Sequence, residues 1–162
     1  MIAQSRTLIF SGMAIAMIGL PRVSLLILNV TPSVPVGLYV TSPAELVRGD
    51  FVLVARDTAA HRAAVAKGLI RPGMRLLKRV AGLPGNRVCM FGQTVWINGS
   101  IKVSSRPADG HGRALRTGRG CRVMAAGQLF VLGSYRNSFD SRYFGPICRD
   151  DVVSRVVPIW LF

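Results

Sequence analysis

Short runs of β-branched, aromatic and other apolar residues recur along the chain, and groups of Gly, Pro, Asn and Asp divide them. The runs cover residues 37–40, 50–54, 75–80, 94–97, 128–132 and 152–157. Runs of this length between turn residues are typical of strands. The pattern predicts a mainly β fold, in which the strands form an antiparallel, barrel-like sheet.

One helix is expected to interrupt this sheet. Residues 59–67 are rich in alanine, Asp57 or Thr58 can cap their start, and Gly68 and Pro72 follow their end. Further along, Asn98-Gly99 between two apolar residues predicts a hairpin turn. Residues 106–120 are rich in Gly and Arg and are interpreted as a long mobile loop. We find no internal repeat and no second folded domain.

The N-terminal segment is apolar but broken. Residues 7–20 follow Arg6, and Pro21-Arg22 interrupts them before residues 23–28 become apolar again. As one element the segment reaches across a bilayer core of ~30 Å; as two elements it is a signal-peptide core followed by a first strand. No small-x-small cleavage site follows Leu20, which favours an uncleaved membrane anchor over residues 1–28 and an exported domain over residues 29–162.

Charge is the main compositional feature of the 162 residues. Lysine and arginine number 21 against 7 acidic residues, which gives a formal net charge of +14. The basic residues are scattered, and the chain has no helix-turn-helix, zinc-finger or aromatic RNA-binding signature. We therefore expect no nucleic-acid partner. A solvated basic face that meets anionic lipid headgroups or an acidic partner explains the charge better.

Two short segments carry the candidate chemistry. Ser33 follows the apolar N-terminal segment, and Lys78 lies in an apolar strand beside Leu77 and Val80. A serine nucleophile needs a base, and a lysine serves as one only where burial keeps it neutral. Together the two residues suggest a Ser-Lys hydrolase. Taken alone, Ser33 between Pro32 and Pro35 would more often be a turn serine, and Lys78 an edge-strand residue.

Other catalytic or metal-binding arrangements find little support. His61 and His111 have no partner residues in the sequence from which to assemble a Ser-His-Asp triad. The spacing of Cys89, Cys121 and Cys148 is not that of a metal site, and no cofactor is implied. Three cysteines allow at most one disulfide. The pair that we expect is Cys121 with Cys148, which leaves Cys89 as a buried free thiol.

Four ordered motifs resemble the boxes of the type I signal peptidases. They are Ser33-x-Pro35-x-Gly37-x-Tyr39, Arg48-Gly49-Asp50, Lys78-Arg79-Val80-x-Gly82-x-Pro84-Gly85 and Ser138-x-Asp140-Ser141-Arg142-Tyr143-Phe144-Gly145-Pro146. The resemblance covers residues 29–157. Within that family the chain looks most like the TraF-type peptidases of conjugative transfer, which mature a pilin. The proline two residues after the serine, the alanine-rich helix and the sequence of the last motif all point there.

The resemblance implies a role for each matching residue. Ser33 would be the nucleophile and Lys78 the general base, while the Thr31 hydroxyl and the Ser33 N–H would form the oxyanion hole. Ser138 would orient the lysine amine, and Asp140 and Arg142 would brace the sheet beside it. The last motif departs from the family at its start, where Ser134-Tyr135 follow Gly133 instead of Asp-Asn.

The function implied is that of a serine endopeptidase anchored in the inner membrane, with its catalytic domain in the periplasm. Its substrate would be a pilin precursor or another preprotein, cut at a site with short side chains. The conjugative transfer machinery and membrane lipid would be its partners, and the pilin could leave linear or cyclised. Two alternatives stay open: a general signal peptidase, and a non-catalytic component of a secretion channel.

Overall fold

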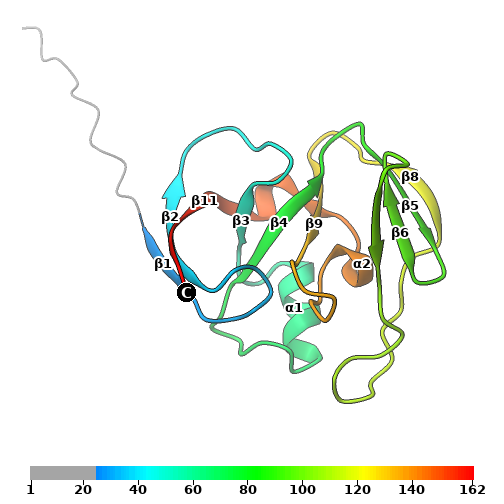
Figure 1. Cartoon of the computed structure of the whole chain (residues 1–162), viewed down its shortest axis with the longest axis horizontal. Coiled ribbons are helices and arrows are strands. Elements are labelled where there is room, and N and C mark those ends of the chain that lie inside the picture. The colour runs from blue at the N-terminus through cyan, green and yellow to red at the C-terminus, as the bar shows by residue number, and fades with distance from the viewer. Residues whose placement is uncertain (1–24) are drawn as a thin grey trace, which may run out of the picture.

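A curled, seven-stranded antiparallel sheet forms the body of the protein in a computed structural model, which describes residues 25–162 (Figure 1). Its strand order is β1-β2-β11-β3-β4-β9-β10. The strands are β1 (Leu26–Asn29), β2 (Gly37–Ser42), β3 (Phe51–Val54), β4 (Leu76–Gly82), β9 (Gln128–Leu132), β10 (Ile147–Cys148) and β11 (Val152–Leu161). The mainly β fold predicted from the sequence is thus confirmed.

A second sheet of four strands stands beside the first, on the right of Figure 1. Its order is β7-β6-β5-β8, from β5 (Arg87–Phe91), β6 (Thr94–Ile97), β7 (Ile101–Ser104) and β8 (Gly120–Val123). Phe130 and Leu132 of β9 pack against Val88 and Ile97 of this sheet, so an apolar core joins the two. The predicted turn joins β6 to β7, with positive φ at Asn98 and Gly99.

Two short helices and one 3-10 turn complete the fold. They are α1 (Ala59–Ala66), α2 (Ser141–Phe144) and η1 (Arg149–Asp151). Thr58 caps α1 by accepting a hydrogen bond from the His61 N–H, whereas Asp57 has a positive φ and stands outside the helix. Small residues on one face of α1, Ala60 and Ala64, pack under β3 and β4 in the main core. The helix α2 and the strands β8 and β10 were not predicted.

The last strand, β11, lies in the middle of the main sheet. Its residues pair with β2 on one side and with β3 on the other. The β1–β2 hairpin therefore reaches the rest of the sheet through β11, and the turn of that hairpin carries Ser33.

The predicted N-terminal anchor falls mainly on residues 1–24, which lie outside the described part of the chain. The boundary expected at residue 28 falls inside β1, so residues 26–28 belong to the sheet. Across residues 25–162, no helix combines the length and the apolar character that a bilayer span requires.

Candidate active site

Ser33 lies in a tight turn between β1 and β2 that a single buried amide organises. The Nδ2 group of Asn29, the last residue of β1, donates hydrogen bonds to the carbonyls of Thr31, Val34 and Pro35 at 2.9, 3.2 and 2.9 Å. Its Oδ1 atom accepts from the Thr31 N–H and hydroxyl. An amide has both donors and an acceptor, which this turn needs at one point.

Apolar burial fixes the rest of the same turn. Val34, the neighbour of Ser33, is fully buried in a small cluster with Tyr39, Leu53 and Leu77. The Tyr39 hydroxyl donates a 2.6 Å hydrogen bond to the Pro35 carbonyl. With Val34 and Tyr39 both inside the core, the half-buried Ser33 is presented towards β4, where its Oγ atom lies 3.4 Å from the Leu77 carbonyl oxygen.

Lys78 is almost completely buried in β4, with 3% of its surface exposed. Its Nζ atom donates a 2.7 Å hydrogen bond to the Ser138 hydroxyl. Burial away from water disfavours the ammonium and lowers the pKa of Lys78 to about 8, although the Asp140 charge raises it and the Arg142 charge lowers it further. About a tenth of this lysine is therefore a neutral amine at pH 7, the form that a general base must have.

Asp140 and Arg142 form a buried, bidentate ion pair behind the lysine. The Asp140 oxygens accept from the Arg142 Nε and Nη2 atoms at 2.7 and 2.6 Å. The same guanidinium donates to the carbonyls of Ser138 and Ser104, so it fastens the last motif to the end of β7. Both residues thus brace the loop that holds Ser138.

Gly133 brings the serine turn and the last motif into contact. Its neighbour Ser134 donates an N–H to the Ser33 carbonyl at 2.6 Å, and its own N–H donates to Asp140. A Cβ at this position would lie 1.9 Å from the Ser138 hydroxyl oxygen and 2.8 Å from the Ser33 carbonyl oxygen. Only glycine allows these segments to approach so closely.

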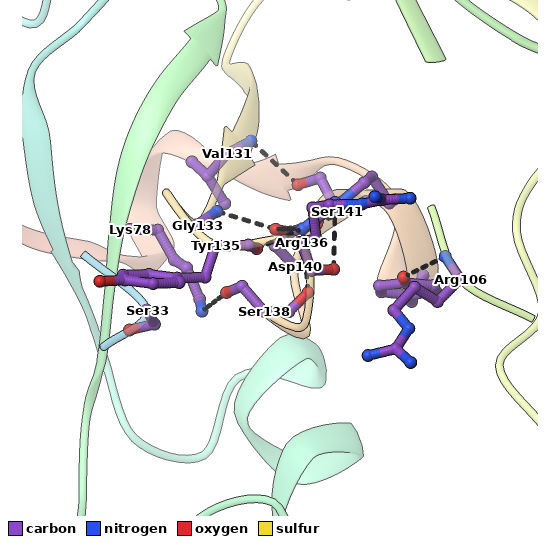
Figure 2. Close-up of polar contacts among 12 residues, drawn as sticks. Ser33, Lys78, Arg106, Val131, Gly133, Tyr135, Arg136, Ser138, Asp140 and Ser141 are labelled. Atoms are coloured by element: carbon purple, nitrogen blue, oxygen red, sulfur yellow. Dashed lines mark hydrogen bonds and ion pairs between the residues drawn. The ribbon is translucent and has the colours of Figure 1, made fainter. Parts of the chain in front are cut away.

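Ser33, Lys78 and Ser138 line one pocket of about 340 Å³, together with Thr31, Tyr135 and several apolar side chains. Figure 2 shows the Lys78 amine between Ser33 and Ser138, with the Tyr135 ring alongside. No direct hydrogen bond joins Ser33 to Lys78 in the described chain, and such contacts often tighten only when substrate binds. The arrangement places a serine hydroxyl in the same pocket as a lysine, and the lysine ammonium can lose its proton to become a neutral amine.

The Thr31 hydroxyl oxygen lies 3.3 Å from Ser33 Oγ. Its single hydroxyl hydrogen, however, is donated to Asn29 Oδ1. Thr31 must therefore rotate its O–H group before it can donate to an oxyanion.

The structure brings all six predicted site residues together, and it adds two that the sequence analysis missed. Asn29 acts through hydrogen bonds within a turn whose shape no local motif specifies. Gly133 acts through its close approach to the Ser33 turn, which is distant from it in the sequence. The only sequence signal for Gly133 was its place at the start of the last motif.

The cysteine prediction was wrong. Cys89 and Cys121 form the disulfide, while Cys148 is an exposed free thiol on β10. The physical reason is that β5 and β8 are neighbours, which places Cys89 directly opposite Cys121 with 3.9 Å between their Cα atoms. Neither β8 nor its register with β5 was predicted, so the sequence offered no geometry for choosing between the three possible pairs.

No histidine of the described chain lines this pocket. His61 is buried at the start of α1, where its ring contacts the Met74 carbonyl and the Asp57 N–H. It therefore has a structural role. Within residues 25–162, no three His, Cys, Asp or Glu side chains gather as a metal site requires.

Known proteins resemble this chain over most of its length. Residues 2–161 match the family model described as "Signal peptidase, peptidase S26". The chain is 36% identical over 146 residues to the "Conjugal transfer protein TraF" of Agrobacterium tumefaciens (strain 15955). This alignment covers 83% of this chain and 82% of the relative. It is 32% identical over 142 residues to a "Plasmid transfer protein TraF" of Escherichia coli, with 81% and 80% covered.

Among solved structures, a signal peptidase I from Enterococcus faecalis V583 has 25% identity and a TM-score of 0.43, over 70% of this chain and 98% of that one. The match to the family model extends over nearly the whole sequence, and the curated relatives are matched over most of their length. The chain therefore belongs to the S26 signal peptidase family, a family of serine peptidases.

Proposed function

We propose that this protein is a membrane-anchored serine endopeptidase that uses Ser33 and Lys78 as a catalytic dyad to process a pilin precursor in plasmid transfer. The observation that carries the proposal is the burial of Lys78, with a pKa of about 8, in the pocket that Ser33 lines. The names of the relatives, conjugal and plasmid transfer proteins TraF, support the transfer context.

In the proposed reaction, neutral Lys78 takes the proton from Ser33 Oγ as that oxygen attacks the scissile carbonyl. The Ser33 N–H and a rotated Thr31 hydroxyl hold the oxyanion that develops. The Lys78 ammonium then protonates the leaving amine. Ser138 keeps the amine in place, since the Nζ–H that it accepts leaves the nitrogen lone pair free for the Ser33 proton.

The buried ion pair tunes this base. Asp140 alone would stabilise the Lys78 ammonium, and Arg142 alone would oppose it. Because the two are bonded to each other, their opposite effects on the lysine partly cancel, and burial dominates its pKa.

The second half of the reaction decides the product. Water that attacks the acyl-enzyme gives a linear pilin, whereas the pilin's own N-terminal amine gives a cyclic one that is lighter than the linear product by one water. A tethered amine reaches effective molarities of ~10⁵ M or more when it is well oriented. We propose cyclisation as the natural outcome. A mature pilin of linear mass with a reactive α-amine would leave simple hydrolysis.

We also propose that the catalytic domain faces the periplasm at the surface of the inner membrane. The position of Arg6 ahead of the apolar N-terminal run supports this orientation. Exposed apolar side chains around the Ser33 turn support contact with lipid; they are Leu26, Leu28, Val30, Trp160 and Phe162. A reporter that is active only in the cytoplasm, fused after Phe162, should be inactive; activity there would reject this topology.

Purified full-length protein in detergent, mixed with a pilin precursor of a conjugative transfer system, tests the function. Wild-type protein should cleave the precursor, Ser33→Ala should not, and Ser100→Ala in the exposed β6–β7 turn should behave as wild type. Full activity of Ser33→Ala would reject the dyad. Equal processing of unrelated preproteins would instead indicate a general signal peptidase, and no cleavage by the wild type would indicate a non-catalytic scaffold.

A further inference from the structure

Arg56 and Arg75 lie at the same end of the β3–β4 strand pair. Val54 at the end of β3 is paired with Leu76 at the start of β4, so the chain leaves and enters the sheet at adjacent points. Both arginines are exposed, and neither takes part in an ion pair or a hydrogen bond in the described chain. Two unpaired guanidinium groups at one end of a strand pair make this end positively charged.

These arginines line a second pocket, of about 390 Å³, which adjoins the first. The two pockets share Thr31, Met74, Arg75 and Leu77 as lining residues. The opposite wall of the second pocket is β1, the edge strand of the main sheet, which leads directly to the Ser33 turn. A substrate held in extended form at Ser33 therefore passes Arg75 within a few residues of its scissile bond.

We propose that Arg56 and Arg75 form an anion subsite that binds a carboxylate of the substrate, close in sequence to the cleaved bond. The inference rests on the proposed peptidase function and adds to it the chemistry of the substrate. A guanidinium presents a planar fork of donors that matches a carboxylate, and it stays charged at every working pH. The carboxylate comes either from an Asp or Glu side chain or from the C-terminus of the precursor.

Binding tests the subsite without requiring turnover. Fluorescent peptides with an Ala-x-Ala core are added to the full-length Ser33→Ala protein, and anisotropy gives the dissociation constants. One flanking position at a time carries Glu or Gln, and a second series compares free-acid with amidated C-termini. We expect about tenfold tighter binding of the carboxylate form at one position or at the chain end, as charge-assisted pairs to two arginines provide.

Charge variants assign this preference to the two arginines. In the Ser33→Ala background, Arg56→Gln with Arg75→Gln should abolish the preference, and Arg75→Glu should shift it towards peptides with Lys at that position. Arg122→Glu is the matched control, because it makes the same change of charge on β8 of the other sheet. Circular dichroism confirms that each variant is folded.

Equal binding of all carboxylate and neutral pairs, or a preference that survives the double Gln variant, would overturn the proposal. If the peptides bind equally but the double variant no longer binds phosphatidylglycerol vesicles, the arginines contact lipid instead. The proposed function has its own readout, the cleavage of the precursor by wild-type protein. Cleavage without a carboxylate preference would therefore reject the subsite alone.

Discussion

The Lys78 amine donates a 2.7 Å hydrogen bond to the Ser138 hydroxyl, 60 residues further along the chain. Both residues are buried. The Ser138 hydroxyl is therefore a polar partner for the lysine in a position that water reaches poorly. This contact holds the nitrogen in the pocket that Ser33 also lines. The role proposed for Lys78 depends on its neutral form, which can be tested by substitution and by pH.

Lys78→Arg should abolish precursor processing as completely as Lys78→Ala. A guanidinium keeps its proton at every accessible pH, so it cannot serve as a base even though it preserves the positive charge. Cleavage of the precursor by purified protein is the measurement. Arg79→Lys, at the exposed neighbouring position, is the control for a basic exchange in β4. Substantial turnover by Lys78→Arg would remove Lys78 from the mechanism.

The pH profile of kcat/KM should rise with an apparent pKa of about 8, the pKa of Lys78, and level off above it. The neutral amine is the active form, so activity should fall about tenfold for each pH unit below that value. A kcat/KM that stays constant from about pH 6 to about pH 9 would contradict the assignment of Lys78 as the general base.

Lys78 should make the free energy of unfolding rise with pH. A lysine in a salt bridge has the opposite effect, because its pKa is raised in the folded protein. The pKa of this lysine is about 8 in the folded protein, against an ordinary value of 10.5 for the unfolded chain. Between these values the unfolded chain binds more protons, so stability rises with pH. The gain is about 3 kcal/mol, by 1.36 kcal/mol per pKa unit. Urea titrations should show this rise in wild-type protein and its loss in Lys78→Met. The same rise in both would disprove it.

Gly133→Ala should reduce kcat/KM by about a hundredfold or more, because the new methyl group displaces Ser138 and the Ser33 turn. The free energy of unfolding should fall by about 1–3 kcal/mol, as overpacking usually causes. Gly110→Ala is the matched control, since a Cβ there meets no atom within 4 Å. Normal activity of Gly133→Ala would show that this close approach is not needed.

Asn29→Asp should lower kcat more than it changes KM. The substitution keeps the shape of the side chain but removes the donors to three backbone carbonyls, which leaves buried acceptors unpaired at about 1–3 kcal/mol each. Asn98→Asp is the control, because Asn98 uses only its Oδ1 acceptor, towards the Arg87 N–H. Unchanged kcat in Asn29→Asp would mean that the Ser33 turn holds its shape without this amide.

Alkylation of the unreduced, unfolded protein should label one thiol, Cys148. Cys121→Ser should lower the free energy of unfolding by about 3–4 kcal/mol, the value for closing a loop of this length. Cys148→Ser should leave it unchanged. Peptide mapping that links Cys148 to another cysteine would contradict this pairing.

Strands with strong local signals were predictable from the sequence. Those at 51–54, 76–82 and 128–132 are apolar runs that become central strands, buried at most positions. By contrast, β8 is exposed at all four residues and β10 has only two, so neither has an apolar pattern to find. Their existence depends on pairing with strands that are distant in sequence.

The same distinction applies to the candidate site. Ser33, Lys78 and Ser138 belong to motifs of recognisable composition, and the structure brings them to one pocket. The importance of Gly133 comes from the distance between two backbones, and that of Asn29 from the shape of a turn. Neither property produces a hydrophobic period or a composition that can be recognised in the sequence.

The position of β11 also sets the order in which the site can be assembled. Within the sheet, the hairpin with Ser33 and the strand with Lys78 are connected through residues 152–161, which are synthesised after every residue of the pocket. A ribosome that has made every residue of the pocket has therefore not yet made the strand that aligns them. A chain that stops before this strand holds both reactive groups, but it should be inert towards its neighbours in the cell.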